Sequence, residues 1–423
     1  MKRKADVESE KTLEPISNRR RTDECAPLPE GCLRLSFPSS VSRQLPAFQY
    51  PNQLISFSYT PERELVFDDS AMRYYCAPLL NSDLGFAYDA WIKRPEERGR
   101  LDGLLTACLR EEVTPERNRA NVITWRGIMT KILTAPYEER DVWDLNVMYI
   151  NGTLYFEEHT TDEKLREKED MTPRNRKQSY YGYAFESYCT SATPDPRQDP
   201  EKRPNGWSGN VNTNVQWCSV VKTKLGDNRL IIGGEVDCVN GEYTGQPSTY
   251  VELKTSLNIR NYQDEARFEK KLLKFYFQSF LLGVPDIKVG FRTPAGRITD
   301  IQSFKTIQLP RLVRGKPGAW DPNLCLDWGN SFLTFLRSSI ESWGQGEQAH
   351  NVIGPRGSKT PSALDREVGP KATKGSNVWR VTFYPGKGAQ VVLLDDEAVK
   401  EVQNKENRIG FLPKNYWDTV AGC

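Results

Sequence analysis

Residues 233–239 read GGEVDCV, and residues 250–256 read YVELKTS. Both runs are apolar and strand-like, yet each carries two charged residues: Glu235 and Asp237 in the first, Glu252 and Lys254 in the second. Side chains two positions apart on a strand point to the same face of a sheet. Two neighbouring strands would therefore aim three carboxylates and one ammonium group at one place. We expect a sheet to form here and a charged site to lie on it.

Two interpretations of this charge stay open. In the first, Glu252 and Lys254 form an ion pair and Asp237 caps a turn, which is a purely structural role. In the second, the carboxylates hold a divalent metal, because Mg²⁺ and Mn²⁺ prefer oxygen ligands and an uncompensated carboxylate on a half-buried strand is costly. An acid followed, here fifteen residues later, by E-x-K on a strand is the general layout of many metal-dependent nucleases.

The composition narrows the chemistry that is available. The chain has 423 residues and a net charge of +2, so no global basic field points to a nucleic-acid partner. Its nine cysteines form no C-x-x-C pair, and its only histidines are His159 and His350, which disfavours a zinc knuckle, a disulfide framework and a histidine-based triad. No run is long enough for a membrane helix, and the N-terminus lacks the apolar core of a signal peptide. If the chain is an enzyme, carboxylates, lysines, arginines and metal must carry the reaction.

Hydrophobic periodicity predicts a single mixed α/β domain, with largely antiparallel β-sheets surrounded by helices. The helical patterns cover residues 100–113, 120–139, 179–191, 265–283 and 324–342. Hairpins are expected at residues 147–158, with Asn151-Gly152 as the turn, and at residues 288–301 and 378–394. These elements alternate irregularly, and no internal repeat is visible.

The folded domain is expected to comprise residues 41–343 and 377–420, separated by a flexible surface insertion at 344–376 that is rich in Gly, Pro, Ser and charge. Residues 1–40 are expected to be a disordered basic tail. The tail carries the clusters Lys2-Arg3-Lys4 and Arg19-Arg20-Arg21, which are consistent with a solvated segment or with a bipartite nuclear import signal.

Three further stretches bear on the charged site. GYAFE at 182–186 places Glu186 on a helix between aromatic residues, where it is either a surface acid or a ligand. Arg126, between Trp125 and Gly127, stands on an apolar helix and needs an anion, either a structural carboxylate or a phosphate. Lys270, Lys274 and Gln278 form one stripe of a helix, which is either a solvated face or a track for a nucleic-acid backbone.

Seven stretches in this order resemble the Rai/DXO family of RNA 5′-end decapping nucleases, over about residues 57–417 without the insertion. They are TWRGIMTKILTAPYE (124–138), GYAFE (182–186), NVNTNVQWCSVVKTKLG (210–226), GGEVDC (233–238), YVELKTS (250–256), KLLKFYFQSFLLGVP (271–285) and GFLPKNYWD (410–418). The resemblance implies a metal site at a cleft between sheets.

Residue by residue, the resemblance implies three overlapping sets of site residues. The metal ligands, for Mg²⁺ or Mn²⁺ and for two ions, are Glu186, Glu235, Asp237, Glu252 and the carbonyl of Leu253, and the catalytic residues are Glu235, Asp237, Glu252 and Lys254. The substrate-binding residues are Arg63, Trp125, Arg126, Gly127, Cys218, Glu235, Lys254 and Gln278. One departure is visible at Gly99, where relatives can carry an acid, so no contact is carried over from that segment.

The function implied is a nuclear hydrolase that acts on RNA 5′ ends: triphosphates, unmethylated caps and NAD caps. It would leave 5′-monophosphate RNA for a Rat-type nuclear 5′→3′ exoribonuclease, with possible 5′→3′ exonuclease activity of its own, and no membrane partner is expected. Two alternatives stay open. The chain could be a mainly non-catalytic stabilising partner of that exoribonuclease, although its intact set of charged residues argues against this. It could also be a metal-dependent DNA endonuclease, which the WRG and GYAFE contexts disfavour.

Overall fold

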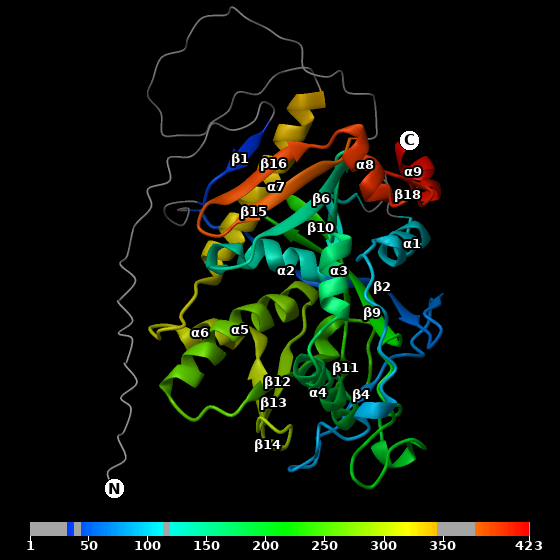
Figure 1. Cartoon of the computed structure of the whole chain (residues 1–423), viewed down its shortest axis with the longest axis vertical. Helices are drawn as coiled ribbons and strands as arrows, with labels where there is room; N and C mark the ends of the chain where they lie inside the picture. The colour runs from blue at the N-terminus through cyan, green and yellow to red at the C-terminus, as the bar shows by residue number, and fades with distance from the viewer. Residues whose placement is uncertain (1–31, 38–43, 113–118, 345–376, 423) are drawn as a thin grey trace, which may run out of the picture.

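A computed structural model describes residues 32–37, 44–112, 119–344 and 377–422 (Figure 1). The expected insertion at 344–376 and most of the expected tail at 1–40 lie outside these residues. Part of the tail prediction is wrong, because Leu33–Leu35 form strand β1, which pairs antiparallel with β16 (Gly388–Leu393). Among the described residues, every helix is too short or too polar to cross a membrane.

The larger of the two main sheets has ten strands and is mixed. Most neighbours are antiparallel, but β5 (Val122–Trp125) pairs in parallel with both β7 and β10. In spatial order the other strands are β1, β16, β15 (Trp379–Tyr384), β6 (Trp143–Ile150) and β7 (Thr153–Glu158) on one side of β5, and β10 (Asn228–Glu235), β9 (Gln216–Leu225), β2 (Phe48–Tyr59) and β3 (Leu65–Val66) on the other.

The second sheet has six strands and lies in the lower half of Figure 1. Its order is β14 (Ile298–Lys305), β13 (Asp286–Arg292), β12 (Tyr250–Leu257), β11 (Cys238–Val239), β4 (Tyr74–Tyr75) and β8 (Thr190–Ser191). A short ribbon of β17 (Arg408–Ile409) and β18 (Leu412–Pro413) stands apart from both sheets. The prediction of a mixed α/β fold with helices around largely antiparallel sheets is confirmed.

Each of the five predicted helical stretches contains a helix, with one exception that is helical only in part. The described part of the chain also has four short helices that the sequence pattern did not predict, over residues 162–169, 309–313, 396–403 and 414–421. In chain order the helices are α1 (Asp102–Arg110), α2 (Arg126–Thr134), α3 (Asp162–Glu169), α4 (Pro173–Cys189), α5 (Tyr262–Leu282), α6 (Leu309–Val313), α7 (Pro322–Gly344), α8 (Asp396–Gln403) and α9 (Lys414–Ala421). The exception is the stretch 120–139, which is not helical throughout. Its first part is strand β5, because the run Val-Ile-Thr favours an extended backbone and two neighbouring strands pair with it.

The three expected hairpins are present as β6–β7, β13–β14 and β15–β16. In the first, Asn151 has φ of 46° and Gly152 has φ of 89°, so both turn residues lie in the left-handed region that a tight two-residue hairpin turn requires. Asn and Gly are the residues that adopt this conformation most readily, which is why the sequence signals this turn so clearly.

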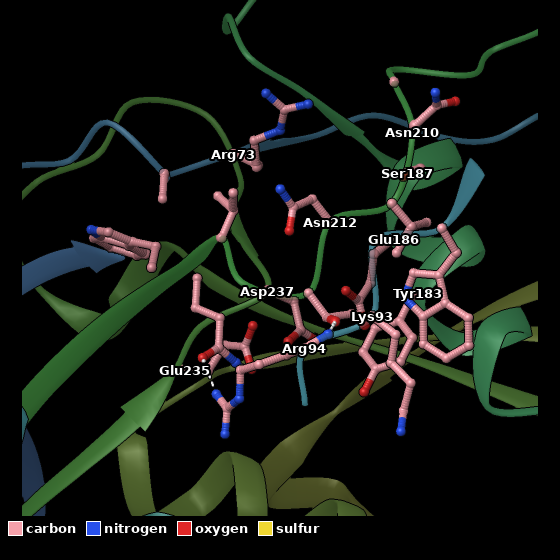
Figure 2. Close-up of a pocket in the computed structure, with 18 of the residues that line it drawn as sticks. Arg73, Lys93, Arg94, Tyr183, Glu186, Ser187, Asn210, Asn212, Glu235 and Asp237 are labelled. Carbon is pink, nitrogen blue, oxygen red and sulfur yellow. Dashed lines mark hydrogen bonds between the residues drawn. The ribbon is translucent and has the colours of Figure 1, made fainter. Parts of the chain in front are cut away.

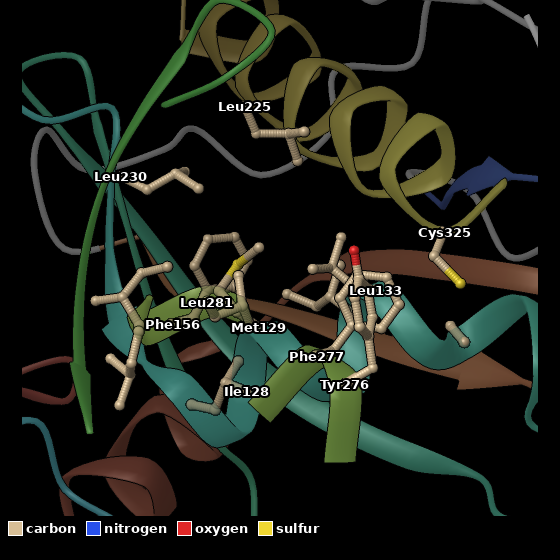
Figure 3. Packing of buried hydrophobic residues seen from close by; sticks show 14 of the residues in the cluster. Ile128, Met129, Leu133, Phe156, Leu225, Leu230, Tyr276, Phe277, Leu281 and Cys325 are labelled. Carbon is tan, nitrogen blue, oxygen red and sulfur yellow. The ribbon is translucent and has the colours of Figure 1, made fainter. Parts of the chain in front are cut away.

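The main hydrophobic core lies between the ten-stranded sheet and helices α2, α5 and α7. Figure 3 shows residues of α2, α5, α7 and strands β7, β9 and β10 meeting there, including Met129, Leu133, Phe277, Leu281 and Leu230. A second cluster covers the other face of the sheet beneath α1 and α9. The sheet is therefore packed on both sides, which gives β10 a rigid setting for the acid at its end.

The chain leaves one main sheet and enters the other within a single short segment. Glu235 is the last residue of β10 in the ten-stranded sheet, and Cys238 is the first residue of β11 in the six-stranded sheet. The neighbours of β12 are β11 and β13, so β10 and β12 are not neighbours in one sheet, and that expectation is wrong. The acids meet because Val236 and Asp237 bridge the two sheets, a link that local periodicity does not reveal.

Gly233 allows β5 and β10 to approach closely just before this link. A methyl group at Gly233 would come within 2.7 Å of the Trp125 ring and 3.0 Å of Leu104. The ring cannot easily withdraw, because its Nε1 donates a hydrogen bond of 2.8 Å to the carbonyl of Arg100. We therefore expect Gly233→Ala to lower the free energy of unfolding by about 1–3 kcal/mol in urea denaturation.

The matched control is Gly182→Ala, at a helical glycine of α4 where an added methyl group meets nothing within 4 Å. There alanine should raise the free energy of unfolding by about 0.5–1 kcal/mol, because it restricts the unfolded chain. Equal effects of the two substitutions would show that crowding at β10 is not what the glycine relieves.

Candidate active site

Three carboxylates from different elements reach one cleft of about 510 Å³. Glu235 ends β10, Asp237 stands in the link between the sheets, and Glu186 lies near the C-terminal end of α4 (Figure 2). The predicted aromatic anchoring of α4 is present, since Tyr181 and Phe185 are buried in the cluster against the six-stranded sheet. The cleft therefore opens where the two sheets and this helix meet.

Glu252 lies beside this cleft in β12, in a compact cluster with two cations. Its Oε2 accepts a hydrogen bond of 2.8 Å from the Arg126 guanidinium, and its Oε1 accepts one from the Lys254 ammonium. The Glu252 side chain is almost fully buried. Burial by itself would raise the pKa of this carboxyl, but Arg126 and Lys254 outweigh it and hold the pKa at about 2. The ion pair expected between Glu252 and Lys254 is present, with Arg126 as a second cation.

The other three carboxyls have raised pKa values. Burial and then the charge of Glu252 raise the pKa of Asp237 to about 7, despite the opposing effect of Lys254. Burial also raises the pKa of Glu235, and burial with the charges of Asp237 and Glu235 raises the pKa of Glu186 well above its usual range. In each case burial is the largest cause, and neighbouring acids add to it.

The predicted ligand set is gathered in one region but is not arranged as a closed metal shell. Among the residues that the structure describes, no three acidic, histidine or cysteine side chains converge closely enough to hold one ion. Both Glu252 oxygens are already bound by cations. Asp237 Oδ2 accepts a hydrogen bond of 2.6 Å from the Leu253 backbone N–H, so Leu253 lies beside this acid. Glu186, Glu235 and Asp237 nevertheless offer the oxygen donors and unbalanced charge that suit a hard divalent cation.

A hydrogen-bond network at the start of β9 connects Glu235 to two arginines. Gln216 Nε2 donates a bond of 2.8 Å to Glu235 Oε2, while Gln216 Oε1 accepts bonds from Arg63 at 2.6 Å and Arg94 at 3.2 Å. Arg63 also stacks over Tyr59, with 3.6 Å between the guanidinium carbon and the ring centroid. Arg63 is thereby placed near the acids, as the sequence predicts, through an amide that the sequence did not single out.

The remaining predicted substrate residues occupy several places around the cluster. Cys218 pairs with Glu235 across β9 and β10, and burial raises the pKa of its thiol. Trp125 is half-buried directly before Arg126, and Gly127 follows in the first turn of α2. Gln278 is half-buried on α5, and its side-chain amide makes no hydrogen bond within the described residues. Of the predicted site residues, only Glu186, Glu235 and Asp237 line the cleft itself.

The basic stripe of α5 is largely neutralised. Lys270 lies 3.3 Å from Glu139, and Lys274 lies 3.7 Å from Glu138. Both lysines are well exposed, so these pairs contribute little to stability. Their surface carries a balanced charge, which favours the interpretation of a solvated helix face over that of a backbone track.

Sequence reasoning missed most of the rim of the cleft. Figure 2 shows Arg73 and Asn210 across the cleft from the acids in this view, with Asn212 between, and Lys93, Arg94 and Tyr183 beside the acids. Lys93 and Arg94 come from the segment before α1, from which no contact was carried over. Asn210 and Asn212 belong to the run NVNTN at 210–214, and the close spacing of its asparagines is the sequence feature that could have indicated the opposite rim. The rim also holds Glu96, Glu97 and Glu201, and Lys93 pairs with Glu96 at 3.1 Å. Arg73, Arg94 and the asparagine amides are the rim groups that suit a phosphate-rich ligand.

Acids from the end of one sheet, from the link between the sheets and from a helix line one cleft beside a buried E-x-K strand, an arrangement typical of nucleases of the PD-(D/E)XK class. Residues 49–417 match the family model described as "RAI1 like PD-(D/E)XK nuclease". The chain belongs to the Rai/DXO family of decapping nucleases.

Individual relatives agree with this assignment. The chain is 36% identical to the decapping nuclease RAI1 of Mycosarcoma maydis, an alignment that covers 93% of this chain and 91% of the relative. It is 38% identical to the decapping and exoribonuclease protein of Rattus norvegicus, over 72% of this chain and 78% of the relative. Among solved structures, Scheffersomyces stipitis Rai1 in complex with (3′-NADP)⁺ and calcium ion matches with a TM-score of 0.68 and 27% identity, over 90% of this chain and 98% of that one.

Proposed function

We propose that this chain is a metal-dependent hydrolase of RNA 5′ ends, which removes triphosphates and incomplete or NAD caps and leaves a 5′-monophosphate. One observation carries the proposal: Glu186, Glu235 and Asp237 share a cleft whose rim supplies Arg73, Lys93 and Arg94. A cap or triphosphate is a chain of phosphates, and only a site with both a metal-binding floor and a cationic rim suits it.

Glu186, Glu235 and Asp237 would hold a divalent metal, Mg²⁺ or Mn²⁺, with Glu252 and the Leu253 carbonyl completing the proposed ligand set. The raised pKa values of the three cleft acids support this, because a bound cation would offset the burial and the neighbouring negative charge that disfavour their ionised forms. A related structure contains calcium ion. When bound, such a metal polarises a phosphoryl oxygen and lowers the pKa of a bound water. Two ions are proposed, as for many enzymes that cleave phosphate esters.

The protein's own cations have separate roles in this proposal. Lys254 and Arg126 are held by Glu252 at the edge of the acidic cluster, where they offset negative charge that develops on the scissile phosphate. Burial opposes their charge, but Glu252 raises the pKa of both groups, so each stays protonated. Arg63 and Arg94, fixed by Gln216, orient the terminal phosphates. Positioning by preorganised donors lowers the barrier without any reorganisation during the reaction.

The cellular role proposed is 5′-end quality control in the nucleus. The basic clusters near the N-terminus support nuclear import. The monophosphate product suits a Rat-type 5′→3′ exoribonuclease, which we propose as a partner. A relative named decapping and exoribonuclease protein supports a possible exonuclease activity in this chain as well.

We expect hydrolysis to require a divalent metal and to stop in chelator. The test incubates the full chain with triphosphorylated, GpppN-capped, m7GpppN-capped, NAD-capped and monophosphorylated RNA, each with Mg²⁺ or Mn²⁺ and each with EDTA, and identifies the released product. Pyrophosphate, a cap dinucleotide and single nucleotides distinguish the three activities. Full activity in EDTA would remove the metal mechanism, and a strict Zn²⁺ requirement would contradict the oxygen ligand set. Cleavage of DNA but not RNA would favour an endonuclease instead.

A further inference from the structure

A second cavity, of about 280 Å³, lies at the opposite end of β9 and β10 from the active site. Four of its lining side chains are cations: Arg119, Lys222, Lys224 and Arg229. The rest are Gln49, Leu54, Ala120, Thr223, Leu230 and Ile231, so no acidic residue of the described part of the chain lines it. The active-site mechanism uses none of these groups.

Strand register places two of the cations directly opposite each other. Arg229 of β10 pairs with Lys224 of β9, and Lys224 in turn pairs with Gln49 of β2. Like charges at directly opposed positions of an antiparallel pair destabilise a sheet. Lys222 stands two residues from Lys224 and so points to the same face. The fold thus concentrates positive charge on two neighbouring strands, at a cost in stability.

Acidic groups compensate only part of this charge. Lys224 lies 3.6 Å from Asp227, whose side chain is 98% exposed, so that pair is weak. Arg119 lies near the Tyr149–Glu341 pair at the edge of the cavity. Lys222 and Arg229 form no ion pair within the described part of the chain, and both are exposed. Two cations of the pocket are therefore available for an external anion.

We propose that this basic pocket binds the phosphate backbone of single-stranded RNA downstream of the 5′ end that occupies the active site. This inference rests on the proposed function. Gln216 and Lys222 are even-numbered residues of the regular strand β9 and share a face, and six residues of strand span about 20 Å. Cys218 and Val220 lie between them on that face and are buried in the cluster beneath α1, so an RNA whose 5′ end is held at Gln216 must pass around α1 and needs several nucleotides to reach Lys222.

Two features favour RNA as the occupant. The substrate is already tethered at the cleft, so its downstream phosphates are present near the pocket at high effective concentration. The lining also combines exposed Lys and Arg with the Gln49 amide and Thr223 hydroxyl, the groups that commonly contact phosphate oxygens. The contacts are to the backbone, so they are expected to be independent of sequence.

The test compares two double variants that each remove two positive charges. Lys222→Gln/Arg229→Gln changes the basic pocket, and Lys270→Gln/Lys274→Gln changes the α5 face, where Glu138 and Glu139 balance the charge. Binding of a long 5′-triphosphorylated single strand and of a 5′-triphosphorylated trinucleotide is measured by fluorescence anisotropy in chelator, over a series of salt concentrations.

For the long strand, the pocket variant should bind about five- to tenfold more weakly at low salt. Its slope of log affinity against log salt should be shallower by about 1.4, the value for two phosphate contacts on single-stranded nucleic acid. Trinucleotide binding should match wild type, because that ligand cannot reach the pocket, and the α5 variant should match wild type for both ligands.

Unchanged affinity and slope for the long strand would overturn the inference and leave the pocket to an acidic protein partner. An equal loss for the trinucleotide would also overturn it, because the effect would then act through the active site. Thermal unfolding of both variants checks that they remain folded. Failure of the proposed function would be seen separately, as absence of trinucleotide hydrolysis by the wild-type chain with metal.

Discussion

Replacing both Glu235 and Asp237 by alanine is expected to lower the rate of hydrolysis of triphosphorylated RNA at least about a hundredfold. That factor corresponds to roughly 2.7 kcal/mol of transition-state stabilisation. The physical reason is that these two acids stand at the link between the sheets, where they line the cleft and crowd Glu186. Steady-state kinetics with Mg²⁺ or Mn²⁺ measures the loss.

The same double variant should remain folded, which distinguishes a metal site from a structural ion-pair network. Burial and neighbouring acids raise the pKa of both carboxyls, so in the metal-free protein their removal relieves repulsion. The melting temperature without metal should hold or rise, and the stabilisation by added Mn²⁺ should shrink. Glu163→Ala/Glu167→Ala on the exposed helix α3 serves as the control and should leave both activity and metal response intact.

A lower melting temperature together with activity reduced only by the unfolded fraction would show that Glu235 and Asp237 are structural. A soluble double variant that hydrolyses triphosphorylated RNA at the wild-type rate would end the metal-site assignment. Binding to an exoribonuclease partner should survive the substitutions, and its loss would indicate that the partner contacts the cleft.

Arg126→Ala should cause the largest loss of stability among single substitutions at the site, about 3–5 kcal/mol. It leaves Glu252 buried with Lys254 as its remaining cation, and an incompletely compensated buried charge is costly. Urea denaturation at neutral pH measures the change in unfolding free energy. Lys131 lies on the same helix as Arg126 and forms a half-exposed pair with Glu158 of β7. Lys131→Ala should therefore cost no more than about 1 kcal/mol.

A double-mutant cycle shows whether the loss comes from the stranded carboxylate. Arg126→Ala/Glu252→Gln should be less destabilised than the sum of the two single variants, because the buried carboxylate that Arg126 compensates is then absent. The pH dependence has a defined sign. The pKa of Glu252 is lowered from 4.5 to about 2, so its contribution is present above about 4.5 and is lost as pH falls toward 2. A single-variant loss below about 1 kcal/mol would contradict the assigned ion pair.

The sequence predicted those parts of the fold that short-range patterns determine. Helices such as α5 and α7 have apolar faces that repeat along one element, and the β6–β7 turn needs residues that tolerate positive φ. The stretch 120–139 was assigned wrongly because an apolar run that passes from a buried strand into a helix has no break in its hydrophobicity.

The sequence predicted the charged strand residues of the site but missed those whose role depends on long-range contacts. Charged residues on strands, such as Glu252 and Lys254, violate the expected alternation and are conspicuous in the sequence. Arg94 and Gln216 violate nothing, because polar residues on loops and strand ends are ordinary. Their importance comes from long-range contacts, since Gln216 joins Glu235 to arginines that are far away in sequence. The crossing of Val236 and Asp237 between sheets has the same tertiary origin.

That crossing also governs how the enzyme should inactivate. Glu235 and Asp237 are attached to both sheets through one short link, and Glu186 lies on α4 against the six-stranded sheet, so separating the two sheets disperses the three acids. Heat inactivation should therefore follow the first cooperative unfolding event, whichever sheet is the less stable, with no active intermediate that keeps only half of the fold. Residual activity then becomes a direct measure of the fraction of molecules in which both sheets are intact.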